Sequence, residues 1–375
     1  SPRNTGQLQY LARNSLVLNS AMMTKHPQFS EPLPDGRLLC TLCPRECQLA
    51  DEQRGLCFVR KREGDKIELT TYGRSSGFVI DPIEKKPLNH FYPGSSVLSF
   101  GTAGCNLSCK FCQNWDMSKS REMDILQSPA TPEAIARAAR DHECHSVAFT
   151  YNDPVIFYEY AVDTAIACHE LDINTVAVTA GYINDTAREG FFQCMDAVNV
   201  DLKGFSESFY HEFCTGSLQP VLDTLEYLVS ETQVWTEITT LLIPGENDSE
   251  NELDAMTRWI AEHLGPDVPL HFSAFHPDYK LMTHPPTTHQ SLLKAKRIAL
   301  KNGLNYVYLG NVHDPENAST ICPACGETVI SRVGYTITEW HLNAKRNCVS
   351  CGQTLPGIFE PVHGTWGNRY QRIQL

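Results

Sequence analysis

The sequence is short of positive charge and has no apolar run of membrane-spanning length. Lys and Arg total 31 against 44 Asp and Glu, so the formal net charge is -13 over 375 residues. Without a basic tail to neutralise a row of phosphates, nucleic acid is not expected as a substrate. The first residues lack the basic-then-apolar order of a secretory signal, and no segment approaches the ~20 apolar residues of a membrane helix. We therefore expect a cytoplasmic protein without membrane association.

Cysteine, by contrast, is abundant and clustered. Fifteen cysteines in a chain without an export signal favour metal ligands and reduced thiols over a disulfide framework. Three groups stand out, which are Cys40, Cys43, Cys47 and Cys57, then Cys105, Cys109 and Cys112, and finally Cys322, Cys325, Cys348 and Cys351. Four isolated cysteines are interpreted as small buried apolar residues, namely Cys144, Cys168, Cys194 and Cys214.

Short β-branched runs alternate with segments of helical period from residue 97 onward. The predicted strands are 97–100, 146–150, 175–179, 197–201, 235–242, 270–274 and 306–309. The predicted helices between them are 133–141, 155–170, 221–230, 251–263 and 288–302. This alternation predicts an α/β fold with a parallel sheet, built as a partial TIM-like (β/α)6 barrel. In such barrels the chemistry gathers at the carboxyl ends of the strands.

Composition divides the chain into three parts. Residues 1–95 are expected to form an N-terminal arm and a cysteine-rich metal-binding segment, with the first 35 or so residues read as a loosely held arm. The barrel would occupy residues 96–318. Residues 319–375 lose the strand-helix rhythm and are expected to form a zinc-ribbon-like module.

The stretch GTAGCNLSCKFCQNW, residues 101–115, places Cys105, Cys109 and Cys112 straight after the first predicted strand. Three thiolates can bind three irons of a four-iron cluster, which leaves the fourth iron open to another ligand. A buried structural trio, or a zinc site completed by a distant histidine, would be the alternatives.

This spacing resembles the C-x3-C-x-aromatic-C signature of the radical S-adenosylmethionine (SAM) superfamily, with Phe111 as the aromatic residue. The resemblance implies a [4Fe-4S] cluster on the three cysteines and SAM chelated to the open iron by its amino and carboxylate groups. An electron from a reductant such as flavodoxin or ferredoxin would cleave SAM to a 5'-deoxyadenosyl radical that abstracts hydrogen from a substrate. Phe111 would line the adenine side of the cluster.

Several later stretches resemble SAM-binding positions of the superfamily. TYNDP, residues 150–154, departs from the usual Gly-Gly-Glu-Pro-like turn, but Asn152 or Asp153 would offer an oxygen to the SAM ammonium group. A helix N-cap followed by proline is the alternative reading of the same residues. Gly181, in AGY, corresponds to a position near the SAM ribose.

Three further residues complete the predicted SAM pocket. Asp201 and Lys203, in DLK, resemble the Asp-x-Lys of glycyl-radical-activating enzymes, in which the lysine pairs with the SAM carboxylate; a strand-end ion pair is the alternative. Ile243, in LLIPGEND, lies in a turn that resembles the adenine-contact turn and otherwise reads as a Pro-Gly loop. His271, in LHF, corresponds to a SAM-contacting histidine or is a satisfied core histidine.

The two flanking cysteine groups predict further metal sites. The CPACG and CVSCG knuckles present four thiolates, Cys322, Cys325, Cys348 and Cys351, and predict structural zinc, with a rubredoxin-like iron as the minor alternative. The N-terminal group, Cys40, Cys43, Cys47 and Cys57, would hold zinc or an auxiliary iron-sulfur cluster. Its irregular spacing slightly favours zinc.

From about residue 40 to the end, the chain resembles the radical SAM member of the AmmeMemoRadiSam system, a relative of pyruvate formate-lyase activating enzyme. The resemblance rests on LCPRECQL, GLCFVR, DPIEKKPLNHFYPG, CNLSCKFCQNW, TYNDPVIFYEYA, DLKGF, HFSAFHPDYK, YVYLGN, CPACG and CVSCG. It implies Memo-like and AMMECR-like partners and a protein or small-molecule substrate. The DPIEKKP loop would frame the active site, although alone it reads as a solvated charged turn.

Two other functions remain open on this sequence. One is activation of a glycyl radical enzyme by hydrogen abstraction from a backbone glycine. The other, from a different class, is an iron-sulfur or metal-binding scaffold or carrier, which would explain the clustered cysteines but would leave the barrel pattern without a role.

Overall fold

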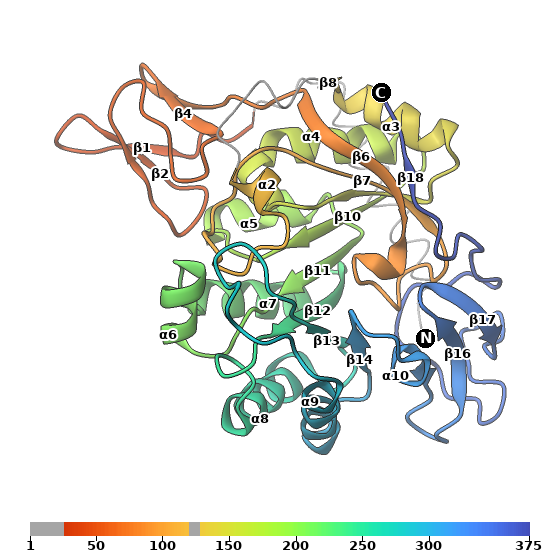
Figure 1. Cartoon of the computed structure of the whole chain (residues 1–375). Coiled ribbons are helices and arrows are strands. Elements are labelled where there is room, and N and C mark those ends of the chain that lie inside the picture. Colours follow the sequence, from red (N-terminus) through yellow and green to blue (C-terminus); the bar gives the residue numbers. More distant parts are fainter. Residues whose placement is uncertain (1–25, 120–127) are drawn as a thin grey trace.

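A central sheet of ten strands organises the computed structural model, which describes residues 26–119 and 128–375 (Figure 1). Seven of its described strands run parallel and neighbour one another in chain order. These are β7 (Ser96–Gly101), β9 (Ser146–Phe149), β10 (Asn174–Thr179), β11 (Ala197–Asp201), β12 (Trp235–Leu242), β13 (Leu270–Ala274) and β14 (Val307–Gly310). The predicted α/β class, the parallel sheet and all seven predicted strands are confirmed.

Helices follow the parallel strands and cover the outer face of the sheet (Figure 1). They are α3 (Pro132–Asp141), α4 (Tyr158–His169), α5 (Asp185–Phe192), α7 (Gln219–Glu231), α8 (Glu250–Trp259) and α9 (His289–Lys301). Every residue of β7 and β9 is buried. Continuous apolar strands are expected when helices pack on one face and a barrel interior lies on the other.

Local sequence sets where these helices begin. The side chains of Thr131, Ser249 and Thr288 each accept a hydrogen bond from a backbone N–H in the first turn of α3, α8 and α9. Two predicted helices are more irregular than their sequence pattern. The predicted helix 155–170 opens as the 3-10 turn η3 (Pro154–Phe157) before α4, and the predicted helix 251–263 ends as the π turn η5 (Ile260–Leu264).

Three antiparallel strands extend the sheet beyond the sequence prediction. β6 (Arg74–Pro82) pairs with β7, and β6 in turn pairs with β8 (Ser128–Pro129) and with β18 (Gln371–Arg372) near the C-terminus. The proposed border between residues 95 and 96 therefore separates two strands of one sheet. The three-part domain division stays a proposal.

The DPIEKKPLNHFYPG loop closes one end of the barrel. It contains the turn η1 (Ile83–Lys85), and its Ile83, Leu88 and Phe91 pack against buried residues of four parallel strands, which are Val97, Ala148, Val176 and Ala197. The reading of this loop as a solvated turn is wrong, because Asp81, Glu84 and Lys86 are buried.

The cysteine-rich segments lie on opposite sides of the central sheet in Figure 1. The N-terminal one contains β1 (Ser30–Pro32), β2 (Leu38–Cys40), β3 (Gln48–Leu49), β4 (Arg60–Glu63) and β5 (Lys66–Leu69). The predicted loose arm is wrong where Ser30–Pro32 pairs with β2; residues 1–25 lie outside the described residues. The C-terminal one contains β15 (Thr320–Ile321), β16 (Thr328–Val333) and β17 (Thr336–Trp340).

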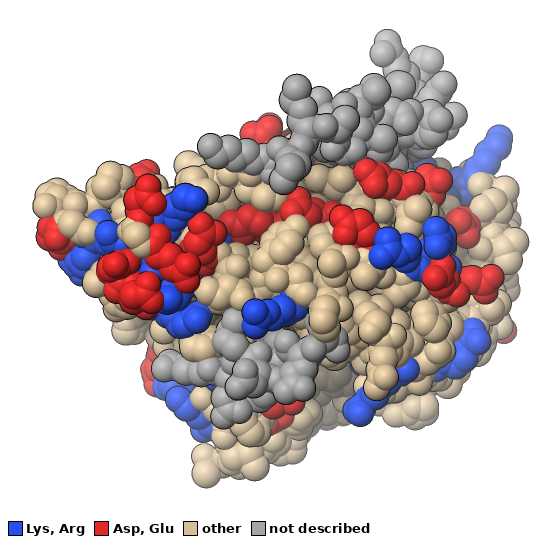
Figure 2. Space-filling view, turned by 90° about the horizontal axis from the view of Figure 1, so that it is seen from above, with Lys and Arg blue, Asp and Glu red and all other residues tan. Residues whose placement is uncertain are grey.

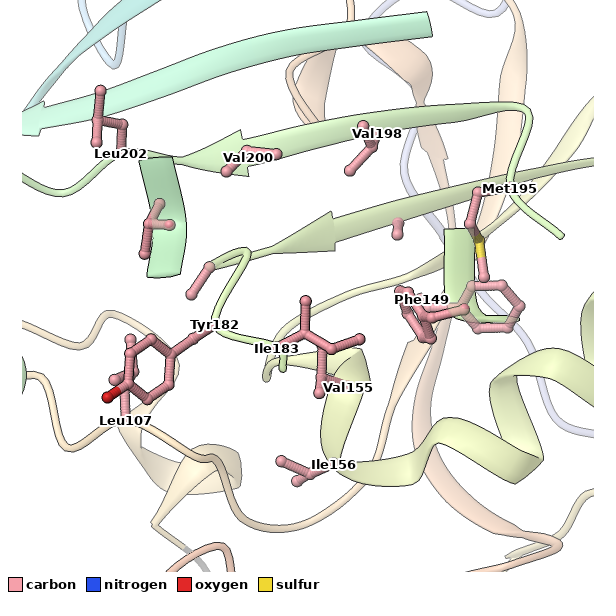
Figure 3. Packing of buried hydrophobic residues seen from close by; sticks show 14 of the residues in the cluster. Leu107, Phe149, Val155, Ile156, Tyr182, Ile183, Met195, Val198, Val200 and Leu202 are labelled. Atoms are coloured by element: carbon pink, nitrogen blue, oxygen red, sulfur yellow. The ribbon is translucent and has the colours of Figure 1, made fainter. Parts of the chain in front are cut away.

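The main core joins the cysteine loop to the barrel. Leu107, between Cys105 and Cys109, is 1% exposed and belongs to the same buried cluster as Tyr182, Val200 and Leu202. Figure 3 shows the Leu107 side chain beside the ring of Tyr182. The loop is therefore anchored to the barrel core by the apolar side chain of Leu107.

No helix of residues 26–119 or 128–375 combines the length and the apolar character of a membrane span. On the face drawn in Figure 2, acidic and basic groups are interspersed and the described residues form no continuous basic area.

Candidate active site

A cavity of about 630 Å³ opens among the loops that follow the parallel strands. Its wall brings together most of the residues predicted to bind the cluster and SAM, which are Cys105, Cys109, Phe111, Cys112, Asn152, Asp153, Asp201, Lys203 and His271. Gly181 and Ile243 do not contribute to the wall. The predicted residues in the wall thus come from four strands, β7, β9, β11 and β13, or from the loops that follow them.

A row of polar side chains crosses the sheet inside this cavity. The strand register pairs Asp201 with Thr239, Thr239 with His271, and His271 with Tyr308, from β11 to β14. All four residues line the cavity. Because side chains alternate across a strand, one row of the register points to one face, and here that face is the barrel interior.

The cysteine loop is held by backbone and side-chain hydrogen bonds. The N–H of Ser108 donates to the carbonyl of Cys214 (2.9 Å), the N–H of Lys110 to that of Phe213 (2.8 Å), and Lys119 Nζ to that of Leu107 (2.8 Å). The short helix α2 (Trp115–Ser118) follows, and its Ser118 hydroxyl lies 3.0 Å from Cys112 Sγ. These hydrogen bonds hold the loop against residues 213 and 214 and against α2.

The electrostatics of the loop favour one thiolate. A hydrogen bond from Cys214, aided by the positive charges of Lys203 and Lys119, lowers the pKa of Cys109 to about 6 despite its burial. Burial raises the pKa of Cys105 to about 12. Cys214 is buried as predicted, but it is also a hydrogen-bond donor to a ligand, which sequence reasoning missed because a lone cysteine carries no motif.

Asn152 and Asp153, adjacent in the chain, do different work. Asn152 Nδ2 donates to the carbonyl of Gly104 (2.8 Å) and its Oδ1 accepts from the N–H of Thr102 (3.1 Å), so it holds the cysteine loop. Asp153 Oδ1 accepts from Val155 N–H (3.2 Å) as the N-cap of η3, whereas its Oδ2 is buried and has no hydrogen-bond partner. The N-cap interpretation is confirmed, and the contact with the SAM ammonium group stays a prediction.

Asp201 and Lys203 form the strand-end ion pair that was the alternative interpretation, with Nζ to Oδ2 at 2.9 Å. Although burial opposes its charge, the Asp201 carboxylate raises the pKa of Lys203 well above its ordinary value. The LLIPGEND turn supports this lysine: Asn247 Nδ2 donates to the Lys203 carbonyl (2.7 Å), and Asn247 Oδ1 accepts from the N–H of Ile243 (2.7 Å). Ile243 is fully buried and reaches the site only through this turn.

Gly181 also acts at one remove. Its φ is +64°, which suits glycine, and its N–H donates to Thr179 Oγ1 (3.0 Å). Thr179 Oγ1 in turn donates to Asp153 Oδ1 (2.8 Å). The Ala-Gly-Tyr turn thus orients Asp153.

His271 is both a cavity residue and a satisfied buried histidine. Its Nε2 donates to Glu237 Oε2 (2.6 Å), and the other Glu237 oxygen accepts from the N–H of His90 (2.7 Å) and from Trp235 Nε1 (2.9 Å). Burial would favour the neutral acid, but these hydrogen bonds keep the pKa of Glu237 below its ordinary value. The orientation of the His271 ring is therefore fixed by Glu237, which is itself held by the hydrogen bonds from His90 and Trp235.

Glu84 and Arg332 form part of the cavity wall that the sequence did not reveal. They are 4% and 2% exposed, and Arg332 Nε lies 3.9 Å from Glu84 Oε1. Glu84 Oε2 and Arg332 Nε have no hydrogen-bond partner. Burial raises the pKa of Glu84 to about 7, against the opposing charge of Arg332. Only a lone arginine in the apolar run VISRV could have signalled this role.

The C-terminal cysteines assemble as predicted for a single metal ion. All four sulfurs lie within 4.8 Å of one another, with Cys322 to Cys351 at 3.6 Å and Cys325 to Cys348 at 3.8 Å. A tetrahedral ion with metal–sulfur bonds of ~2.3 Å needs sulfur separations of ~3.8 Å. Gly326 and Gly352 take φ of 78° and 82° and each donates to the carbonyl of the cysteine four residues earlier (2.9 Å). The group can hold a metal.

Comparison with known proteins identifies the family. A model of the radical SAM superfamily matches residues 100–256. The chain is 37% identical over 332 residues to an uncharacterized protein, MJ0808, from Methanocaldococcus jannaschii, covering 88% of this chain and 98% of that protein. The chain belongs to the radical SAM superfamily. Membership implies SAM and a [4Fe-4S] cluster, and a reductant to supply the electron.

Other radical SAM relatives are more distant. A second Methanocaldococcus jannaschii protein, MJ1632, named as a glycyl-radical enzyme activating enzyme, is 22% identical over 58% of this chain and 80% of its own length. Among solved structures, a domain of pyruvate-formate lyase-activating enzyme from Bacteroides vulgatus covers 44% of this chain and 99% of its own, with 17% identity and a TM-score of 0.40.

The residues of the site fit the cofactors of a radical SAM enzyme. Cys105, Cys109 and Cys112 line one cavity, yet their sulfurs are not gathered as tightly as the C-terminal quartet. A cubane requires such wider spacing because each thiolate binds a different iron. Asp153 Oδ2, an orphaned buried acceptor in the same wall, suits a cationic ligand group.

Proposed function

We propose that this radical SAM enzyme reductively cleaves SAM and passes a hydrogen atom from its substrate to the 5'-deoxyadenosyl radical. The observation that supports the proposal most directly is the meeting of Cys105, Cys109 and Cys112 with Asp153 and Lys203 in one cavity wall. The cluster, when bound, supplies the electron; the chain supplies binding, orientation and exclusion of water.

Each proposed contact follows from the chemistry of a wall residue. Asp153 Oδ2 would accept from the ammonium group of SAM, because its buried lone pairs have no other donor. Lys203 would pair with the SAM carboxylate. The ion pair with Asp201 holds the ammonium group of Lys203 at the cavity. Phe111, 5% exposed and packed 5.9 Å from the ring of Phe209, would present a rigid apolar face to the adenine.

The substrate is proposed to carry a polar group that can both donate and accept hydrogen bonds. Glu84 and Arg332 line the cavity, and Glu84 Oε2 and Arg332 Nε have no hydrogen-bond partner in the described residues. Leaving such groups unpaired costs about 1–3 kcal/mol each, so a ligand that pairs both is favoured over an apolar one. A cavity of about 630 Å³ must also hold SAM, which suits a small molecule or a narrow peptide segment.

Glycyl radical enzyme activation is the second candidate. The name of the MJ1632 relative and the Asp201–Lys203 pair both favour it. A protein substrate would have to present a single extended loop to the cavity. The resemblance to the AmmeMemoRadiSam system adds Memo-like and AMMECR-like proteins as proposed partners, with flavodoxin or ferredoxin as proposed reductant and zinc as the proposed C-terminal metal.

The proposal is tested by anaerobic turnover. Reconstituted protein given dithionite and SAM is expected to release 5'-deoxyadenosine and methionine, and Cys105→Ala is expected to release neither. Cys144→Ala, which removes a buried cysteine outside the cavity, is the matched control and should keep wild-type turnover. Equal turnover by Cys105→Ala and wild type would refute the proposal.

A spectroscopic measurement separates an enzyme from an iron-sulfur carrier. SAM should change the electron paramagnetic resonance spectrum of the reduced cluster, because it binds an iron of that cluster. A carrier's spectrum would be indifferent to SAM. A glycyl radical signal appearing on a candidate partner protein would favour the activase.

A further inference from the structure

The four N-terminal cysteines surround a small pocket of their own. Its wall is formed by Cys40, Cys43, Cys47 and Cys57 together with Leu42, Ile156 and neighbouring residues. Cys40, Cys43 and Cys57 are buried, Cys47 is partly buried, and none forms a disulfide. Four reduced cysteines that face one pocket are a ligand set, since no other arrangement explains their convergence.

The spacing of these sulfurs distinguishes two kinds of metal centre. Among the described residues, only the C-terminal quartet gathers three or more ligand atoms within 4.8 Å, as a single tetrahedral ion requires. No three sulfurs of the N-terminal set come that close, although all four face one pocket. Cys105, Cys109 and Cys112 share this open arrangement. We propose that Cys40, Cys43, Cys47 and Cys57 bind an iron-sulfur cluster, which spreads its thiolates over several irons.

The immediate surroundings suit an all-thiolate centre. A Cβ at Gly55 would lie 3.6 Å from Cys47 Sγ and 3.7 Å from Cys57 Sγ, so the two sulfurs flank the same point of the main chain. The N–H of Leu56 approaches Cys47 Sγ at 3.5 Å. Arg45 contributes a positive charge to the pocket wall, which partly offsets the net negative charge of four thiolates, whereas the charge of Arg60 is paired with Glu159.

This pocket adjoins the loop that carries the first cluster. Asn106, which directly follows Cys105, forms part of its wall. A Cβ at Gly104 would overlap the carbonyl oxygen of Cys57, so only glycine permits this contact between the two segments. The bidentate pair between Arg60 and Glu159 (2.7 and 2.6 Å) ties the cysteine-rich segment to α4. Two iron-sulfur centres would therefore lie in neighbouring pockets.

The test removes the first cluster and counts what remains. The triple variant Cys105→Ala/Cys109→Ala/Cys112→Ala is purified and reconstituted anaerobically with iron and sulfide. We expect iron and acid-labile sulfide to remain in equal amounts, about four of each per chain for a cubane. Adding Cys43→Ala and Cys57→Ala should remove both. Adding Cys144→Ala and Cys168→Ala instead, two buried cysteines of neither group, should leave both unchanged.

Metal analysis of the wild type covers the case in which a variant fails to fold. About eight irons per chain support the inference, and about four overturn it. Absence of iron from the triple variant overturns the inference. Zinc near two per chain would then place zinc at the N-terminal cysteines, and zinc near one per chain would leave metal only at the C-terminal quartet. The count is independent of the proposed function, because about eight irons without SAM cleavage would refute only that function.

Discussion

At the scale of single residues, two neighbouring side chains of similar chemistry have different roles because their hydrogen bonds differ. The amide oxygen and the amide nitrogen of Asn152 both form hydrogen bonds with residues 102–104. Asp153, by contrast, has one buried oxygen without a hydrogen-bond partner. The residue types were predictable from TYNDP, but the choice between them was not. It depends on which atoms the cysteine loop already occupies, and that is a property of the fold.

Asp153→Asn should therefore weaken SAM binding without weakening the fold. Asparagine keeps the oxygen that caps η3, and the two residues are similar N-caps, so the melting temperature should stay unchanged. The lost charged acceptor is worth about 1.5–3 kcal/mol, or roughly 10- to 100-fold in Kd. Anaerobic SAM titration of the reconstituted cluster measures it, with the exposed Asp141→Asn as control. An unchanged Kd would contradict the role of Asp153.

Glu84 predicts a pH dependence of stability. Its folded-state pKa, about 7, exceeds the ordinary value of 4.5, so the folded protein holds a proton that the unfolded chain has lost. This contribution to stability is present below about pH 4.5 and is lost as pH rises through 7. Glu84→Gln, which stays neutral, should gain about 2–3 kcal/mol relative to wild type between pH 5 and pH 8.

Denaturant unfolding at the two pH values measures this difference. The exposed Glu133→Gln on α3 is the matched control and should follow the wild type at both pH values. If the free energies of unfolding of wild type and Glu84→Gln differ by the same amount at pH 5 and at pH 8, the Glu84 carboxyl is not held neutral by burial.

At the scale of elements, the sequence predicted the strands and helices with a periodic pattern. It missed the short strands and the segments whose structure depends on distant residues. The seven parallel strands and the helices between them follow from β-branched runs and 3.6-residue periodicity, because both faces of those strands are buried. β6 and β18 were not predicted; β6 pairs with the edge that β7 leaves, and β18 pairs with β6. The buried loop of residues 81–94, the floor loop of the barrel, was missed because the sequence does not show that Asp81 pairs with Lys85 and Lys86 or that Glu84 lies beside the distant Arg332.

In the cysteine loop, the side chain that anchors the loop, Leu107, is a different residue from the proposed metal ligands, so the anchor can be tested by itself. Leu107→Ala removes a side chain that is 1% exposed and should cost about 2–5 kcal/mol of unfolding free energy. It should also speed loss of cluster iron to a chelator, since the loop then lacks its core anchor. Leu228→Ala in α7, fully buried but far from the cysteines in sequence, should destabilise similarly and leave iron release unchanged. Equal release rates from both variants would disprove the anchor.

At the scale of the whole molecule, the C-terminal module is part of the active-site wall. Arg332 in β16 donates to the carbonyl of Asn89 (2.9 Å) in the floor loop. The chain beyond the knuckles pairs with the same loop, with Ile358 N–H to the carbonyl of His90 (2.8 Å) and Tyr92 N–H to that of Ile358 (2.7 Å). A metal bound by the four cysteines would thus support a surface that faces the cavity.

Removal of that metal should consequently be felt in the barrel floor. Small structural metal sites supply much of the folding energy of their module, so Cys325→Ser with Cys351→Ser should leave residues 319–375 poorly folded. Hydrogen exchange is expected to rise by orders of magnitude there and in residues 83–95, because the Arg332, Ile358 and His90 bonds are lost together. Exchange in α5, which lies across the central sheet from β16 and β17 in Figure 1, should stay at the wild-type rate. Faster exchange confined to residues 319–375 would show that the floor loop holds its place without the module, and Arg332 would then be a passive neighbour of the cavity.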